Sequence, residues 1–352
     1  MQYSPNQSVL FFSRGKGRGH AIPDVALLED LLQSAPDLDV RFVSYSTGAI
    51  TIRELGHDVI DLGLPEDNSL VETIIQALHL ISDIQPRFVI SHEELAALPS
   101  AKAFQLPTIL LTDWLPLPNS VRMECLNYAD EVIFIDEPGH FDVPPFLRSK
   151  IIYTGPVLRR FGHPLQNKAQ ARARFGFPEH GIVISVIPGG SLESSESKSP
   201  ILAGVLAAFE KIPFKEKILA WIAHPGDNEF VKEYQRVSPT IQILEPRTDI
   251  ETLMIASDLG ITKANRITTL EFWALGVPSI SISHGLNPID DWRVAHIPTN
   301  RALRAGCVTP SLLADLLTTS IQQVASRSHQ LVNNAGLGRQ NAAKRILQHL
   351  RT

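Results

Sequence analysis

Short apolar runs alternate with longer stretches of helical period along most of the chain. Six runs in the first half, rich in Val, Ile, Leu and Phe, predict strands: Ser8–Ser13, Val40–Tyr45, Asp58–Leu62, Phe88–Ser91, Thr108–Thr112 and Glu131–Ile135. Several are apolar at consecutive positions, which is typical of strands in a parallel sheet covered on both faces. Helices are predicted between them, for example over Pro23–Gln33 and Asn68–Ser82. This alternation predicts an open, doubly wound α/β domain.

The alternation stops at Thr154–Pro164, where glycines and prolines without a clear period predict a linker. It then resumes with predicted strands at Gly181–Ile187, Ile218–His224, Ile241–Leu244, Leu259–Thr262 and Ser279–Ser283. We therefore expect one domain over residues 1–155 and another over 156–327. The stretch 328–352 predicts a C-terminal helix, a candidate to pack back on the first domain. Two such domains in series predict a cleft between them, faced by the carboxyl ends of both sets of strands.

The composition fits two packed globular domains. A chain of 352 residues, 44% apolar and 20% charged, is long enough for two cores. The net charge of −5 gives no electrostatic reason to expect nucleic acid as a partner. Cys125 and Cys307 lie far apart in sequence, which fits a reducing compartment rather than a disulfide framework or a zinc site. With no secretory signal and no run of ~20 apolar residues, we expect a cytoplasmic protein. Peripheral contact at the inner face of a membrane stays open.

A glycine-rich loop follows the first predicted strand. Gly15, Gly17 and Gly19 allow tight turns and close approach of a ligand, and the next helix offers free N–H groups. A dinucleotide site is disfavoured, because the spacing is Gly-x-Gly-x-Gly and the second strand ends in Ser44–Ser46 without an acidic residue.

His20 directly follows these glycines, at the mouth of a helix. There it is a candidate general base, and the alternative is a helix-capping histidine. Asp113, after the fifth strand, is a candidate to orient the ring of His20. Glu93, after the fourth strand, is ranked below Asp113, since Glu93 and Glu94 also fit as acids favoured in a first helical turn.

The second domain carries two further loops suited to phosphate. Gly189, Gly190 and Ser191 follow a strand and can approach a phosphate closely. Farther on, Thr268 or Thr269 is expected to cap a helix that carries Glu271 in its first turn. Glu271 could accept hydrogen bonds from a ribose diol, and the alternative is a capping carboxylate. Lys263 and Arg266 are either diphosphate ligands or ordinary surface residues.

These motifs resemble the MurG-type branch of the GT-B glycosyltransferases, which includes a peptidoglycan N-acetylglucosaminyltransferase and diacylglycerol glycosyltransferases. The resemblance covers most of the chain and rests on the segments Gly15–Pro23, Thr112–Trp114, Thr154–Val157, Gly189–Ser191, His224 and Thr268–Pro278. The segment His284–Asp291 occupies the stretch that in relatives touches the donor sugar. Asp290 and Asp291 stand where relatives often carry glutamine, and Ala264–Arg266 replaces a small pair such as Ser-Gly.

The resemblance implies two Rossmann-like domains and transfer of a sugar from a nucleotide donor to an acceptor hydroxyl. The donor is expected to be a UDP-sugar, which is usual in the family, and the acceptor is a lipid, a saccharide or a small molecule. Ser279, at the spacing where retaining relatives carry a second glutamate after Glu271, favours inversion. Asp37-Leu-Asp39 is the only Asp-x-Asp, a possible metal motif, but it lies before a strand and away from the cleft. We expect no metal and no other cofactor, since a helix dipole, Ser191, Lys263 and Arg266 can share the diphosphate charge. Two rivals stay open: a nucleotide-sugar hydrolase or epimerase on the same fold, and a non-catalytic nucleotide-sugar-binding subunit.

Overall fold

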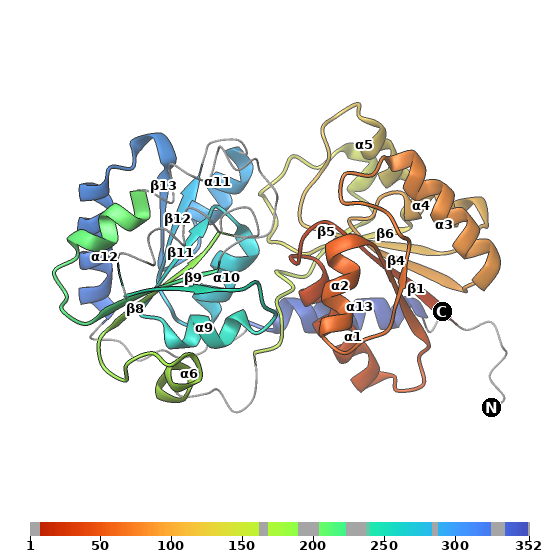
Figure 1. Cartoon of the computed structure of the whole chain (residues 1–352). Coiled ribbons are helices and arrows are strands. Elements are labelled where there is room, and N and C mark those ends of the chain that lie inside the picture. The colour runs from red at the N-terminus through yellow and green to blue at the C-terminus, as the bar shows by residue number, and fades with distance from the viewer. Residues whose placement is uncertain are drawn as a thin grey trace. The chain divides into compact units, whose positions relative to one another are not determined.

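The computed structural model describes residues 8–161, 168–188, 204–222, 238, 240–283, 288–324 and 335–350, leaving aside the side chains of residues 288, 290 and 305. The chain divides into two compact units (Figure 1). Unit 1 is formed by residues 1–160 with 336–352, and unit 2 by residues 161–335. Both units are built on parallel sheets with helices, as the alternation of the sequence predicts.

Unit 1 contains a seven-stranded sheet in the order β3-β2-β1-β4-β5-β6-β7, with all neighbours parallel. Its strands are β1 (Val9–Ser13), β2 (Val40–Ser44), β3 (Val59–Asp61), β4 (Phe88–His92), β5 (Thr108–Thr112), β6 (Glu131–Phe134) and β7 (Ile151–Tyr153). Its helices are α1 (Ala21–Ser34), α2 (Ser46–Glu54), α3 (Leu70–Ile84), α4 (Ala97–Ala103), α5 (Val121–Cys125) and α13 (Leu337–Leu350), with 3₁₀ turns at Leu126–Tyr128 and Pro145–Leu147.

Strand β1 shows why the predicted strands are apolar at consecutive positions. Val9 and Phe11 pack in a core that includes residues of α1 and α13. Leu10 and Phe12 point to the opposite face and pack with Ala77 and other residues of the second core. Because successive side chains of a strand alternate between faces, a sheet covered on both sides needs apolar residues at every position.

Helix α13 completes unit 1 from the far end of the sequence and lies against α1 (Figure 1). Ile346 is fully buried in the core shared with α1 and β1. Arg339 donates from Nε to Asp30 of α1 at 2.7 Å. Farther along the helix, Arg345 and His349 both bind Glu131 of β6, with Nε2 of His349 2.8 Å from the carboxylate.

Unit 2 contains a six-stranded parallel sheet in the order β10-β9-β8-β11-β12-β13. Its strands are β8 (Ile182–Ile187), β9 (Lys217–Ile222), β10 (Ile241–Leu244), β11 (Leu259–Lys263), β12 (Ser279–Ser283) and β13 (Asn300–Arg304). Its helices are α6 (Lys168–Phe175), α9 (Ile250–Ala256), α10 (Arg266–Ala274), α11 (Pro288–Ala295) and α12 (Pro310–Val324), with a helical stretch at 204–211 and a 3₁₀ turn at Ala305–Cys307. In the part of the chain that is described, no helix is both long and apolar enough to cross a membrane.

Candidate active site

The candidate site of unit 1 lies where β1, β4 and β5 end. These strands are neighbours in the sheet, so their carboxyl ends meet at one edge. Ser13, the last residue of β1, pairs with His92, the last residue of β4. The glycine loop that leads to His20 leaves β1 here, and Glu93 follows β4 directly. Residues from distant parts of the sequence are thereby brought together.

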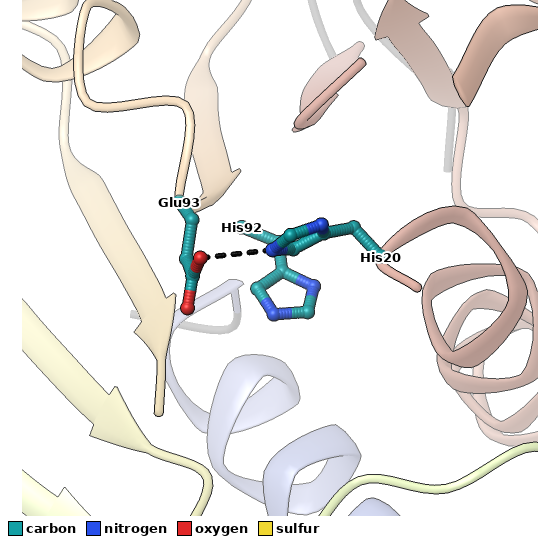
Figure 2. A group of neighbouring side chains, drawn as sticks. All are labelled: His20, His92 and Glu93. Atoms are coloured by element: carbon teal, nitrogen blue, oxygen red, sulfur yellow. Dashed lines mark hydrogen bonds and ion pairs between the residues drawn. The ribbon is translucent and has the colours of Figure 1, made fainter. Parts of the chain in front are cut away.

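Glu93 is the carboxylate that binds His20, with Nε2 of His20 2.8 Å from Oε2 (Figure 2). The same oxygen accepts from Arg14 at 3.3 Å. The other oxygen, Oε1, accepts from Oγ1 of Thr112 at 3.2 Å and from the backbone N–H of Asp113 at 3.3 Å. The Thr112 hydroxyl shares its one hydrogen with the carbonyl of Trp114, at 2.8 Å. Three other donors fix the Glu93 side chain, which is only 4% exposed.

Two further features mark Glu93 as a special position. Its φ is +57°, a left-handed conformation that glutamate adopts rarely and that costs free energy unless the surroundings hold it. Burial by itself would raise the pKa of Glu93, but the charge and hydrogen bond of His20 and the charges of His92 and Arg14 lower that pKa far below its usual range. Glu93 is therefore ionised at neutral pH.

A second histidine–carboxylate pair lies behind the first. Nδ1 of His92 is 2.6 Å from Oδ1 of Asp24, and both side chains are buried. Burial alone would lower the pKa of His92, but Asp24, Glu93 and Asp113 outweigh it and raise the pKa to about 9. His92 is thus a buried cation at neutral pH. Its ring meets that of His20 edge-on, with centroids 4.8 Å apart (Figure 2).

One ring nitrogen of His20 takes no part in the bond to Glu93. An ionised carboxylate can only accept, so Nε2 carries the hydrogen donated to Glu93 and Nδ1 carries a lone pair. Nδ1 is buried and has no hydrogen-bond partner among the residues that the structure describes. His20 occupies the N-cap position of α1, yet its side chain makes no capping hydrogen bond. The geometry therefore matches a base oriented by a carboxylate rather than a helix cap.

The sequence-based ranking of Asp113 above Glu93 is corrected by this arrangement. Asp113 supplies its backbone N–H to Glu93, and its charge acts on His92. The carboxylate on Nε2 of His20 is that of Glu93. The pattern of residue types gives no sign of the left-handed backbone at Glu93, so both acids look equally able to reach the ring.

The three glycines of the loop differ in what they do. A Cβ on Gly15 would lie 2.3 Å from the ring of Tyr45, so Gly15 is needed for packing. Gly17 has a φ of +67°, and its N–H donates to Glu66 at 3.3 Å. A Cβ on Gly19 would meet nothing within 4 Å. Gly19 therefore leaves open space that a ligand could enter.

A small polar pocket of about 50 Å³ lies beside Glu93. The polar groups that line it include Arg14, Tyr45, Glu66, Asn68, Glu94 and Arg122. Inside it, the hydroxyl of Tyr45 donates to Glu94 at 2.9 Å. Burial raises the pKa of Glu94 and, together with Glu94, the pKa of Tyr45. The pocket thus offers both donors and acceptors at close range.

His20, His92 and Glu93 are also the one group in the described part of the chain that places three metal-ligand atoms within 4.8 Å of one another. Nε2 of His20 and Oε2 of Glu93 already bind each other, and Nδ1 of His92 binds Asp24. The hydrogen bonds account for the arrangement without an ion.

The candidate site of unit 2 centres on α10. Asn265 caps this helix, and its side chain accepts from the backbone N–H of Thr268 at 3.2 Å. The expected cap at Thr268 or Thr269 is therefore wrong, because Asn265, a strongly preferred N-cap residue, precedes both. The hydroxyl of Thr269 instead donates to the carbonyl of Asn265 at 2.7 Å.

Glu271 lies in the second turn of α10 rather than the first, and it is 2% exposed. The capping-carboxylate alternative does not hold, since the cap is three residues before Thr268. Arg266, at the first helical position, is buried, and Lys263 ends β11 half-buried. Neither cation is an ordinary exposed surface residue.

Asp291 of α11 accepts from the hydroxyl of Ser283 through Oδ1, while its Oδ2 is buried and has no hydrogen-bond partner in the described structure. Several expected site residues lie outside the described part of the chain: Gly189, Gly190, Ser191, His224, His284 and the side chain of Asp290.

Comparisons with known proteins find relatives of low sequence identity that cover nearly the whole chain. No family model matches the chain. A UDP-N-acetylglucosamine--N-acetylmuramyl-(pentapeptide) pyrophosphoryl-undecaprenol N-acetylglucosamine transferase of Acetivibrio thermocellus is 24% identical over 96% of both chains. Among solved structures, MurG of Acinetobacter baumannii matches with a TM-score of 0.64 and 14% identity, over 98% of this chain and 99% of that one. A UDP-GlcNAc 2-epimerase of Neisseria meningitidis matches with a TM-score of 0.67 and 15% identity, over 98% and 100%. The predicted GT-B fold is confirmed.

Proposed function

We propose that the chain moves a sugar from a UDP-sugar to an acceptor hydroxyl, by inversion and without a metal. It is a glycosyltransferase of the GT-B fold and is similar over nearly its whole length to MurG-type transferases. The names of the curated relatives support UDP-N-acetylglucosamine as the first donor to test. The observation that carries the proposed mechanism is the bond between His20 and Glu93, which leaves Nδ1 of His20 free.

His20 acts as the general base. Its Nδ1 takes the proton of the acceptor hydroxyl while the hydroxyl oxygen attacks the anomeric carbon of the donor sugar. The bond from that carbon to the diphosphate breaks, and the nucleoside diphosphate leaves with the electron pair. Attack opposite the leaving group inverts the anomeric centre. The imidazolium formed on His20 is stabilised by the ionised Glu93 at 2.8 Å.

Unit 1 also supplies the acceptor pocket in this proposal. Glu93 and Arg14 line the polar pocket and also belong to the His20 site, so a group bound in the pocket lies beside the candidate base. Its mixture of guanidinium, carboxyl and hydroxyl groups suits an acceptor part that both donates and accepts hydrogen bonds.

Unit 2 binds the donor. Glu271 accepts hydrogen bonds from the ribose, and Lys263, Arg266 and the start of α10 face the diphosphate charge. The free Oδ2 of Asp291 is an acceptor for a hydroxyl of the donor sugar. The helix dipole and two cations share the charge of the leaving group, which is the task that a metal performs in other glycosyltransferases.

A thermal-shift series with UDP, GDP, ADP and dTDP tests the donor proposal. A nucleotide present at 100 times its dissociation constant stabilises the protein by ~2.7 kcal/mol. We expect UDP to raise Tm most, and equal or absent shifts for all four nucleotides would refute the UDP-sugar proposal. Incubation with UDP-N-acetylglucosamine and EDTA then tests the rest. Release of free sugar or formation of an epimer without an acceptor would favour a hydrolase or epimerase, and loss of turnover with EDTA would overturn metal independence.

A further inference from the structure

The Asp24–His92 pair is placed next to the candidate base but outside the polar pocket. His92 is 4% exposed and Asp24 is fully buried. Among the described residues that line the pocket, Glu93 and Arg14 are present, whereas His92 and Asp24 are not. The edge-on ring contact at 4.8 Å nevertheless couples His92 directly to His20. Any part the pair plays in the proposed reaction is exerted through the neighbouring side chains.

The protonation state of Glu93 decides which nitrogen of His20 is available. An ionised Glu93 accepts from Nε2–H and leaves a lone pair on Nδ1. A neutral Glu93 would donate its proton to Nε2, and the hydrogen of the neutral ring would then sit on Nδ1. In that tautomer Nδ1 cannot accept a proton from an acceptor. Because Glu93 is only 4% exposed, burial favours the neutral, unproductive form.

Nearby cations must therefore keep Glu93 ionised while His20 itself is neutral. Arg14 is one, at 3.3 Å, on a side chain that is 22% exposed. His92 is the other, and its charge lowers the pKa of Glu93. The groups that face His92 are Asp24 on α1, Glu93 after β4 and Asp113 after β5, and all three favour its charged form. His92 thus keeps its positive charge at neutral pH.

We infer that Asp24 and His92 form a positioning pair, whose fixed positive charge keeps Glu93 ionised and thereby holds His20 in the tautomer with a free Nδ1. The inference rests on the proposed role of His20 as base. It assigns His92 to a supporting part, since a ring that already carries both hydrogens cannot accept a proton.

The test is ¹⁵N NMR of the histidine rings, which distinguishes the two neutral tautomers and does not depend on activity. The His20 signals are assigned with His20→Gln. In the native protein we expect neutral His20 to be the Nε2–H tautomer. In His92→Gln we expect the Nδ1–H tautomer to gain population as the pH is lowered. A unit charge about 5 Å away at an effective dielectric of 20 corresponds to about 2.4 pH units, so the acid limb of turnover should move up by about that much.

Two further variants keep the test decisive. If His92→Gln does not fold, Asp24→Asn takes its place in the test. It preserves shape and removes the counter-ion of His92, so it should give a smaller change in the same direction. His140→Gln removes a histidine from another carboxylate, Asp136 at 2.7 Å, and should leave the His20 signals unchanged. An unchanged tautomer and pH profile in folded His92→Gln or Asp24→Asn would overturn the inference. A changed tautomer together with full turnover in His20→Gln would instead overturn the base assignment.

Discussion

Replacing Glu93 by glutamine tests which carboxylate serves His20. The glutamine carbonyl can still accept from Thr112 and from the backbone N–H of Asp113, at 3.2 and 3.3 Å in the native protein. Its amide group must then face Arg14 and Nε2 of His20, which are both donors. His20 can relieve the conflict by accepting through Nε2, which places its hydrogen on Nδ1 and removes the base.

We expect this tautomer change to lower kcat by ~10²–10⁴-fold, the scale of general-base catalysis and of a wrong-tautomer histidine in a catalytic triad. That range corresponds to ~3–5.5 kcal/mol of transition-state stabilisation. Loss of a buried, charge-assisted hydrogen bond should also lower stability by ~1.5–3 kcal/mol. Affinity for the nucleotide should change little, because the proposed donor residues belong to unit 2.

The assay measures UDP release from UDP-N-acetylglucosamine with a working acceptor, and calorimetric titration measures UDP binding separately. Asp113→Asn is the matched variant, since it removes the other carboxylate proposed to orient His20 and keeps the backbone N–H that donates to Glu93. We expect it to lose less than ~10-fold in kcat, which is less than the general-base contribution. Native turnover in Glu93→Gln, with a large loss in Asp113→Asn, would restore the ranking drawn from sequence and refute the reasoning from the structure.

His20→Gln should lower kcat by ~10²–10⁴-fold with normal UDP binding, and native turnover would exclude it as the base. Glu271→Gln should weaken UDP binding about tenfold by removing one ribose hydrogen bond, as calorimetry can measure; unchanged affinity would make Glu271 a buried structural carboxylate. Glu271→Ala is less useful, because the side chain is 2% exposed and its removal costs stability. Burial raises the pKa of Glu131, but Arg345 and His349 outweigh burial and lower that pKa. The ionised Glu131 therefore stabilises the fold fully above the ordinary glutamate pKa of ~4.3, and this stabilisation is lost as the pH falls below that value. Arg345→Ala should therefore flatten the acid limb of stability between about pH 5 and 3, measured by thermal unfolding, and an unchanged limb would contradict this coupling.

Most of the strands that the sequence predicts are buried on both faces, since burial demands consecutive apolar residues. The edge strands β3 and β10 are only partly buried, but they keep apolar residues and are predicted as well. The two strands missed are β7 and β13, each at the edge of its sheet. Strand β13 carries Asn300, Arg301 and Arg304 and is largely exposed. An edge strand is paired on one side only, so it needs no long apolar run and can leave little trace in the pattern, as β13 does.

The site shows a similar division. His20 could be found because glycines and a helix start surround it. The roles of Glu93 and Asn265 depend on backbone conformation and on which residue begins a helix, and neither is visible in residue type alone. Asp24 had a usable signal, because it lies in the first turn of the predicted helix Pro23–Gln33, four positions after His20.

The route of the chain through unit 1 has a consequence for its synthesis. Helix α13 covers part of the face formed by Val9, Phe11 and Ile90, but it is translated only after all of unit 2. At ~5–20 residues per second, this apolar face waits roughly ten to forty seconds for its cover. Unit 2 has its whole sequence available earlier and can fold first. During that interval the nascent unit 1 presents a surface suited to a chaperone, and a stop codon before α13 would leave that surface exposed permanently.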